Sequence, residues 1–241
     1  MAKIQALKKA IRESRRICVF TGAGISCPSG IPDFRSSTGL YSSPIGKYRA
    51  EDMISRTFFN EHPEIFFPFY REKLVYPEAK PNAAHIFFAE LAKQGKEVSI
   101  VTQNVDGLHQ AAGSKDVYEL HGSIHRNYCI KCGRIYDLAT ILLTDGIPRC
   151  PHDGGIIRPD VVLYEESLDP DVVNDALFAI ESADLLIVVG TSLVVYPAAA
   201  YVSHFRGKTL ALINRTPTQY DAHADIAIHA DIVDVVEALK N

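Results

Sequence analysis

The sequence predicts an α/β protein built on a doubly wound parallel sheet, with a smaller domain formed by two insertions. Short runs of β-branched and other apolar residues alternate with segments whose apolar residues recur at helical spacing, as in βαβ units. The run Leu185 to Val189 is apolar throughout, which is typical of a central parallel strand buried on both faces. The alternation stops at residues 36–77 and 123–155, and we assign these two segments to the smaller domain.

Composition and charge narrow the class of protein. The chain has 241 residues, of which 47% are hydrophobic and 22% charged. A chain of this length and composition can bury a sizeable core. Its net charge of −4 argues against nucleic acid as a partner, because such proteins normally carry a basic face. No apolar run approaches the ~20 residues of a membrane span, and the five cysteines fit reduced thiols or a metal better than disulfides. We therefore expect a cytoplasmic protein without membrane partners; the oligomeric state is not determined, and a monomer is the expectation.

The chain begins with a helix and a strand that lead into a glycine-rich loop. Helical spacing covers residues 2–14, and the β-branched run Ile17 to Phe20 predicts a buried strand. The strand ends in Gly22-Ala23-Gly24, where missing side chains let backbone N–H groups approach a phosphate. Cys27 takes the place of the third glycine of a dinucleotide fingerprint. On this loop alone, a plain tight turn is an equally good interpretation.

Residues 36–77 have no sheet-like pattern. They start with Ser, Thr, Gly and Pro and continue with aromatic residues among charges, which predicts a mobile loop followed by a helical insertion. After it, Asn82 is a suitable N-cap for a helix over residues 83–93 that stops at Gly95. The β-branched run Val98 to Val101 then predicts the second buried strand.

Polar residues follow the next strand ends. The second strand runs into Thr102-Gln103-Asn104-Val105-Asp106, and a third, near Val117 to Leu120, delivers His121 and Gly122. In an open α/β sheet, ligands bind at the carboxyl ends of the strands. Amide and carboxylate groups suit ribose hydroxyls and a carboxamide, and an imidazole that titrates near neutrality suits a general base. Helix capping by Asn104 or Asp106 is the alternative interpretation of those two side chains.

The second insertion contains a candidate zinc site. Cys129 and Cys132 form a Cys-x2-Cys pair, and Cys150 follows after seventeen intervening residues, a spacing typical of zinc ribbons. Asp153 stands where a fourth cysteine would complete the second pair, and His152 precedes it. We predict a structural zinc ion held by the three cysteines and by Asp153 or His152; a metal-free module is the alternative.

The C-terminal part resumes the α/β alternation. Residues 156–163 are β-rich, and Asp169-Pro170 opens a helix. The central strand then ends in Gly190-Thr191-Ser192, and a strand over residues 208–213 ends in Asn214. A strand over residues 224–228 and a helix over residues 231–240 complete the predicted fold.

Taken together and in this order, the motifs resemble the signature of the sirtuins, which are NAD-dependent protein lysine deacylases. The resemblance spans essentially the whole chain. It implies a Rossmann-like NAD-binding domain of residues 1–35, 78–122 and 156–241. The smaller domain would combine the cofactor loop and helical insertion of residues 36–77 with a zinc-ribbon module of residues 123–155. The motifs are Gly22-Ala-Gly-Ile-Ser26, Gly30-Ile-Pro-Asp33-Phe34-Arg35, Thr102-Gln-Asn-Val-Asp106, His121-Gly122 and Gly190-Thr-Ser192.

The resemblance implies roles for these residues. The acyl oxygen of the substrate lysine would attack the anomeric carbon as nicotinamide leaves, and His121 would then act as the base that activates a ribose hydroxyl. Asn104 would assist in the nicotinamide pocket, where Asp106 would hold the carboxamide, and Gln103 would hold the ribose. The implied NAD-binding residues are Gly22, Ala23, Gly24, Ile31, Asp33, Phe34, Arg35, Gln103, Asn104, Asp106, Gly190, Thr191, Ser192, Asn214 and Ile232.

The same resemblance implies where an acyl-lysine protein or peptide would bind. The peptide would add a strand beside Val161, Val162 and Leu163, next to Tyr164. The chain has Tyr164-Glu165-Glu166 where the family has an aromatic residue, glycine and glutamate. The Tyr-x-x-Arg pair that holds acidic acyl groups in some sirtuins is Phe67-Pro-Phe-Tyr70 here, so a charge-assisted hydrogen bond is missing.

We therefore expect a deacetylase that releases nicotinamide and O-acetyl-ADP-ribose and has little desuccinylase activity. A protein mono-ADP-ribosyltransferase or an NAD glycohydrolase would use the same NAD-binding residues and is the alternative.

Overall fold

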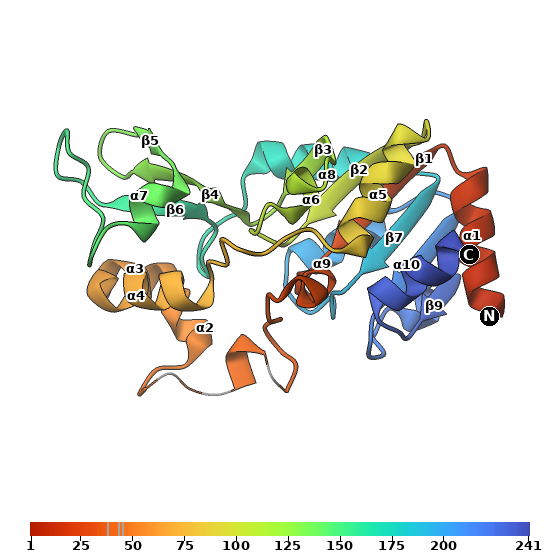
Figure 1. Cartoon of the computed structure of the whole chain (residues 1–241), viewed down its shortest axis with the longest axis horizontal. Helices are drawn as coiled ribbons and strands as arrows, with labels where there is room; N and C mark the ends of the chain where they lie inside the picture. The colour runs from red at the N-terminus through yellow and green to blue at the C-terminus, as the bar shows by residue number, and fades with distance from the viewer. Residues whose placement is uncertain (38, 43, 45) are drawn as a thin grey trace.

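The computed structural model describes residues 1–37, 39–42, 44 and 46–241, which form two unequal parts (Figure 1). The larger part is built on a six-stranded sheet in the order β3-β2-β1-β7-β8-β9. The smaller part holds a three-stranded sheet, β5-β4-β6, and a group of short helices. Both termini lie at the end of the larger part that is far from the small sheet (Figure 1).

All strand pairs in the large sheet are parallel, as the sequence predicts. The chain builds outward from β1 to β3 and then returns to β7 beside β1. The order therefore reverses between β1 and β7, and such a switch point opens a crevice at the carboxyl ends of the strands. The strands are β1 (Arg16–Thr21), β2 (Glu97–Thr102), β3 (Asp116–Glu119), β7 (Leu185–Val189), β8 (Thr209–Ile213) and β9 (Ile226–Ile228).

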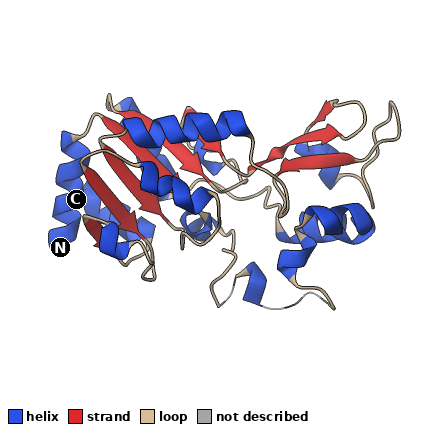
Figure 2. Ribbon diagram, turned by 180° about the vertical axis from the view of Figure 1, so that it is seen from behind, coloured by secondary structure: helices blue, strands red, loops and turns tan. Residues whose placement is uncertain are grey.

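Helices cover both faces of this sheet (Figure 2). Alternate residues of β7 point to opposite faces, so Ile187 packs in one core cluster and Leu186 in the other. This is why the whole strand is apolar. One cluster includes α1 (Ala2–Glu13), α5 (Ala83–Lys93) and α10 (Ile232–Lys240), and the other includes α8 (Pro170–Ser182) and α9 (Ala198–Tyr201).

The predicted helix signals are confirmed. The Asn82 side chain accepts a hydrogen bond from the N–H of Ala84, and Gly95 has a φ of +88° just beyond α5. Asp169 caps α8 in the same way. Among the residues that the structure describes, no helix has the length and apolar character needed to cross a membrane.

The smaller part is held together by an aromatic cluster. Phe59, Phe66 and Phe67 pack edge to face and share one core with Ile141 and Ile157 of the ribbon. The two predicted insertions therefore form one hydrophobic core. Its elements are α2 (Ala50–Met53), α3 (Arg56–Glu61), α4 (Pro63–Lys73), β4 (Gly122–Cys129), β5 (Ile135–Tyr136), α7 (Leu138–Leu142) and β6 (Ile157–Val161). The remaining short helices are α6 (Leu108–Ala111) and the 3-10 turns Ala23–Ile25, Cys27–Ser29, Leu40–Ser42, Val202–His204 and Asp221–His223.

The structure differs from the expected domain boundary at residue 156. The expected NAD-binding domain included residues 157–161, but this segment is β6, which pairs antiparallel with β4 in the small sheet. The physical reason is visible in its burial, since only Ile157 and Pro159 of β6 are buried. A strand inside the parallel sheet would be covered on both faces, whereas β6 is covered on one.

Candidate functional site

A cavity of about 650 Å³ opens at the carboxyl ends of β1, β2 and β7, between the two parts. It brings together residues that are far apart in the sequence, including the candidate base His121. Every residue predicted to bind NAD lines it: Gly22, Ala23, Gly24, Ile31, Asp33, Phe34, Arg35, Gln103, Asn104, Asp106, Gly190, Thr191, Ser192, Asn214 and Ile232.

The two glycine loops of the cavity pack directly against each other. The Gly24 N–H donates to the Gly190 carbonyl at 2.8 Å, and a Cβ on Gly24 would lie 2.7 Å from the Gly190 Cα. A side chain at either position would force the loops apart. These glycines therefore bring the ends of β1 and β7 into contact, a requirement that the sequence pattern did not reveal.

A buried network surrounds the Asp106 carboxylate. One oxygen accepts from the Ser26 hydroxyl at 2.7 Å, and the other accepts from the Leu108 N–H at 2.9 Å. Burial raises the pKa of Asp106, although both hydrogen bonds act in the opposite direction. The Asn104 amide donates to the Gly22 carbonyl at 3.2 Å and to Ser26. One oxygen of Asp106 thus binds the first N–H of α6, although the N-cap of that helix is Gly107, while its other oxygen belongs to the site network.

The His121 ring is fixed by the backbone. Its Nδ1 lies 2.9 Å from the Gln103 carbonyl oxygen, which can only accept, so Nδ1 carries the proton and Nε2 keeps a lone pair. Burial lowers the pKa of His121, partly offset by the same carbonyl. His121 is therefore neutral at physiological pH, the state that a general base requires.

Gly122 explains the position of His121 at the junction of the two sheets. Gly122 has a φ of +76°, and a Cβ there would lie 1.9 Å from the Asp160 carbonyl oxygen. One residue after β6, the Val162 N–H donates to the His121 carbonyl at 2.9 Å. Only glycine lets β6 approach this closely, so the base and the predicted peptide edge are held together.

The predicted peptide edge is partly occupied by the chain itself. The Val162 N–H is bonded to His121, the Leu163 N–H to a Glu166 carboxylate oxygen at 2.8 Å, and the Tyr164 N–H to the Ile54 carbonyl at 3.0 Å. All four residues from Val161 to Tyr164 nevertheless line the cavity. A peptide beside them would therefore not use these three N–H groups.

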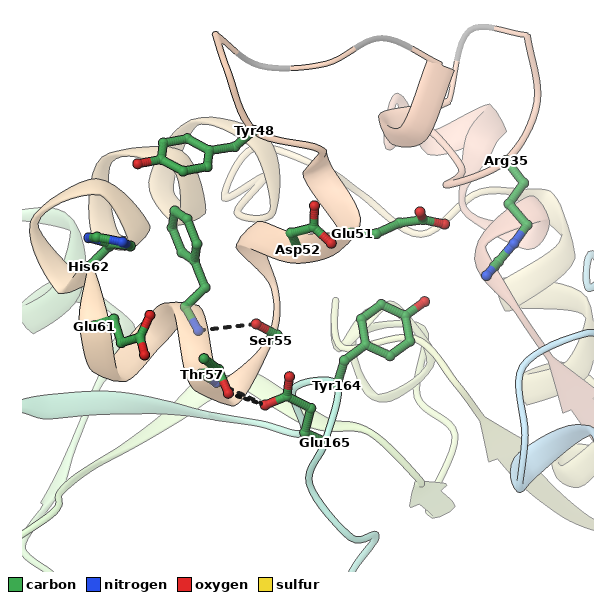
Figure 3. Close-up of a pocket in the computed structure, with 11 residues that line it drawn as sticks. Arg35, Tyr48, Glu51, Asp52, Ser55, Thr57, Glu61, His62, Tyr164 and Glu165 are labelled. Carbon is green, nitrogen blue, oxygen red and sulfur yellow. Dashed lines mark hydrogen bonds between the residues drawn. The ribbon is translucent and has the colours of Figure 1, made fainter.

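A second cavity of about 660 Å³ adjoins Tyr164 and Glu165 (Figure 3). Glu165 has a φ of +71°, a conformation that glycine favours. Its carboxylate accepts from the N–H and the hydroxyl of Thr57, at 3.0 and 2.7 Å, and these bonds lower its pKa. Glu165 thus fastens the end of the peptide edge to the first turn of α3.

The two residues predicted for the acyl pocket are separated by the structure. Both lie on α4 with fully buried side chains. Tyr70 lines the cavity that holds the predicted NAD-binding residues, whereas Phe67 packs against Phe59 and Phe66 at ring distances of 6.0 and 5.4 Å. Phe67 is therefore a core residue of the small part, and the prediction that it contacts substrate is not supported by its position.

The candidate zinc ligands converge. The ligand atoms of Cys129, Cys132, Cys150 and Asp153 all lie within 4.8 Å of one another. The Cys132 and Cys150 sulfurs are 3.8 Å apart, and the Cys129 sulfur is 3.3 Å from an Asp153 oxygen. Zinc bonds of about 2.0 to 2.3 Å in a tetrahedron place ligands about 3.3 to 3.8 Å apart. The donor set fits zinc with Asp153 as the fourth ligand, and His152 is not in the cluster.

Two buried histidines that sequence reasoning missed lie beneath the site. The rings of His85 and His109 are 4.8 Å apart, and His109 Nε2 lies 3.1 Å from the Thr21 hydroxyl. Burial lowers the pKa of His85 to about 4 and that of His109 to about 3. Both rings are therefore neutral in the folded protein. Their only sequence signal is that each lies directly beside apolar residues of a helix, Ala84 and Ile86 for His85 and Leu108 for His109.

These histidines predict a loss of stability in acid. Below about pH 6.5 the unfolded chain protonates both rings, while the folded chain does not until about pH 4. The free energy of unfolding should therefore fall by up to roughly 1.4 kcal/mol per histidine for each pH unit in that window, and should show no such slope above it. Urea unfolding at about pH 7.5 and about pH 5 measures this difference.

The variant His85→Gln should lose less stability between the two pH values than the unchanged protein; an equal loss would contradict the assignment. Replacement of exposed His223 by Gln is the matched control.

Comparison with known proteins identifies the family. The family model described as Sir2 family matches residues 22–197. The chain belongs to the Sir2 family. The resemblance drawn from its motifs is thereby confirmed, and so is the Rossmann-like sheet expected of a Sir2-family chain.

Relatives and solved structures agree with this assignment. The chain is 54% identical over 239 residues to the NAD-dependent protein deacetylase of Clostridium acetobutylicum, covering 98% of each chain. It is 53% identical to that of Clostridium perfringens, covering 95% of each. Among solved structures, a Sir2 protein with p53 peptide and NAD+ has a TM-score of 0.85 at 37% identity, covering 97% of this chain and 95% of that one. A Sir2 protein with deacetylated p53 peptide and 3'-O-acetyl-ADP-ribose has a TM-score of 0.89 at 38% identity, covering 98% and 96%.

Proposed function

We propose that this Sir2-family chain is an NAD-dependent protein lysine deacetylase, producing deacetylated lysine, nicotinamide and O-acetyl-ADP-ribose. The observation that carries the proposal is a neutral His121, with Nε2 free to accept a proton, in a cavity that all the predicted NAD-binding residues line. The deacetylase names of the bacterial relatives support it. So do neighbouring structures that contain NAD+, acetylated peptide or an acetyl-ADP-ribose product.

The cavity has the chemical features that NAD requires. The Gly24–Gly190 contact leaves no room for a Cβ and brings two glycine loops together on the cavity wall, and glycine-rich turns of this kind suit phosphate groups. The Gln103 amide donates to the Thr191 hydroxyl at 3.1 Å, so a ribose would meet side chains that are already oriented. Bound NAD would supply the anomeric carbon and the nicotinamide leaving group.

Each polar residue would have a separate role in the reaction with NAD. Asp106 and Asn104 would orient the carboxamide end, because their positions are fixed by Ser26 and Gly22. His121 would accept a ribose hydroxyl proton at Nε2, while its Nδ1–H stays bonded to the Gln103 carbonyl. The zinc site would take no part in these steps, since four protein ligands leave no open position.

A product analysis separates deacetylation from its rivals. An acetyl-lysine peptide incubated with NAD should lose its acetyl group and generate O-acetyl-ADP-ribose, detected by mass spectrometry. ADP-ribose attached to protein would instead indicate a transferase. Free ADP-ribose with an intact acetyl peptide would indicate a glycohydrolase.

The proposed setting is the cytoplasm, where the chain would act as a monomer on acyl-lysine proteins or peptides. The bacterial deacetylases among its relatives support this setting. The net charge of −4 supports protein rather than nucleic acid as the partner.

Acyl selectivity follows from the residue at position 70. Tyr70 offers a neutral hydroxyl, and the Lys73 ammonium that lines the same cavity lies 2.8 Å from the Glu72 carboxylate. At position 70, a succinyl carboxylate would therefore lack the guanidinium that forms a charge-assisted hydrogen bond with acidic acyl groups in some sirtuins. We expect kcat/KM for a succinyl-lysine peptide to be lower than for the acetyl-lysine peptide by about 100-fold. Comparable values measured side by side would contradict this.

A further inference from the structure

Strand β4 carries a bulge at the place where the two sheets meet. Ser123 pairs with Asp160 of β6, and Asn127 pairs with the adjacent residue of β6, Pro159. Residues 124–126 are therefore extra residues of β4, and we call them the junction bulge. A bulge interrupts backbone pairing and turns side chains in new directions. Contacts other than the backbone ladder must therefore hold β6 in place at this point.

Two contacts fasten the junction bulge to the loop that follows β2. The Ile124 N–H donates to the Val105 carbonyl at 3.0 Å, and His125 Nε2 lies 3.0 Å from the Asp106 carbonyl oxygen. Because a carbonyl only accepts, Nε2 of this ring carries a proton. The bulge is thus tied to the loop that carries the predicted carboxamide ligand, Asp106.

The third residue of the junction bulge, Arg126, connects β3 to β6. Its Nη1 donates to the Glu119 carboxylate at 2.5 Å, and its Nε donates to the Asp160 carboxylate at 2.8 Å. Glu119 ends β3 two positions before His121, and Asp160 directly precedes the predicted peptide edge. The Glu119 side chain is only 8% exposed, so its carboxylate needs a charged partner. One guanidinium therefore joins the strand that delivers the base to the strand that leads into the peptide edge.

This bridge acts through the residues that it holds. Among the described residues that line the cavity of the NAD-binding residues, there is neither Arg126 nor either of its two carboxylate partners. A guanidinium presents its N–H groups in a rigid plane, so bonds to two strands fix the direction of β6 relative to the end of β3. Such control matters for the rate, because misplacing reacting groups by about 1 Å can cost about 100-fold.

We propose that Arg126 is a positioning residue that holds the peptide edge in register with the His121 base. The acyl-lysine then reaches NAD in the orientation that the base requires. This inference rests on the proposed deacetylase function and adds to it a residue outside the cavity. The Arg126 and Asp160 side chains are 51% and 43% exposed, and exposed ion pairs contribute little to stability. The effect should therefore appear in the rate rather than in the stability.

The test breaks the bridge on its peptide side and leaves the Glu119 pair intact. Asp160→Ala should lower kcat for an acetyl-lysine peptide, at saturating peptide and NAD, by about 5- to 10-fold. Its unfolding temperature should stay within about 4 °C of that of the unchanged protein, as expected for the loss of an exposed pair. An unchanged kcat, or a loss of kcat that accompanies a larger drop in unfolding temperature, would overturn the proposal.

A double-mutant cycle shows whether the two halves of the bridge act together. Arg126→Met should lower kcat by about 10-fold. Adding Asp160→Ala to this variant should lower kcat no further, because the connection to β6 is already lost. Losses that multiply in the double variant would mean that the two residues act independently and would overturn the proposal.

Glu97→Ala is the matched control. It removes a comparable exposed ion pair, between Glu97 and Arg15 at 2.7 Å, from the amino end of β2, and should keep the kcat of the unchanged protein. A loss of kcat in this variant equal to that in Asp160→Ala would show that the effect is not specific to the junction bulge and would overturn the proposal. If the unchanged protein does not deacetylate the acetyl-lysine peptide, the proposed function itself is wrong, and this inference fails with it.

Discussion

Replacing His121 with alanine is expected to lower kcat/KM for an acetyl-lysine peptide by roughly 10²- to 10⁴-fold. The imidazole supplies the proton acceptor at Nε2, and no other histidine lines the cavity among the described residues. The variant loses only one backbone contact, from Nδ1 to the Gln103 carbonyl, so the fold should survive. Steady-state formation of O-acetyl-ADP-ribose measures the effect.

A binding measurement distinguishes catalysis from cofactor affinity. His121→Ala should bind NAD within about 3-fold of the unchanged protein, because the base acts after nicotinamide leaves. Asp106→Ala should weaken NAD binding much more, since it removes a buried carboxylate from the Ser26 and Asn104 network. Product formation that is unaffected by loss of His121 would remove this residue from the mechanism.

The rate should also depend on pH in a defined direction. A base works only when it is neutral, so kcat/KM should fall in acid as His121 becomes protonated. Because burial lowers the pKa of His121 below its ordinary value of 6.5, this fall should occur on the acid side of about pH 6.5. A rate that is constant there would contradict the assignment of the base.

The second large effect is expected from Cys150→Ser, which should abolish zinc binding and unfold the small part. Structural zinc contributes about 10 to 16 kcal/mol of apparent binding free energy in zinc-finger peptides near pH 7. Here the ribbon shares its hydrophobic core with α4 through Ile141 and Ile157. Loss of the metal should therefore disturb the Tyr70 side of the cavity as well. Zinc content by metal analysis, together with thermal unfolding, measures both consequences.

Variants at neighbouring positions make this test specific. Asp153→Cys should retain one zinc per chain, because a thiolate is a good ligand, whereas Asp153→Ala should bind zinc more weakly. His152→Ala should leave the zinc content unchanged, since His152 is outside the cluster. Retention of tightly bound zinc in Cys150→Ser would show that the proposed ligand set is wrong.

Local patterns determined most of the large sheet and most of the site. The apolar runs of β1, β2 and β7 are visible because a strand that is buried on both faces needs apolar residues at every position. Gln103, Asn104, Asp106 and His121 follow strand ends directly, and parallel strands bring their carboxyl ends to one edge. The position of each polar residue relative to its own strand was thus sufficient to group them.

The tertiary structure alone decided how the small part is assembled. Whether β6 joins the large or the small sheet depends on long-range pairing with β4, which its own residues do not encode. The same holds for Phe67 and Tyr70, three positions apart on one helix, of which only Tyr70 reaches the cavity.

The choice of the candidate fourth zinc ligand also could not be predicted from the sequence, although the two possible residues are neighbours in the chain. His152 and Asp153 are adjacent and are both competent zinc ligands. The turn after Cys150 brings Asp153 to the cysteines: one of its oxygens accepts from the Gly155 N–H at 2.9 Å and lies 3.3 Å from the Cys129 sulfur. The sequence by itself determined which chemical groups the site contains, because these depend on residue type and local spacing. Only the tertiary structure decided which of two neighbouring side chains joins the candidate zinc cluster, because direction depends on backbone conformation and on contacts with distant residues.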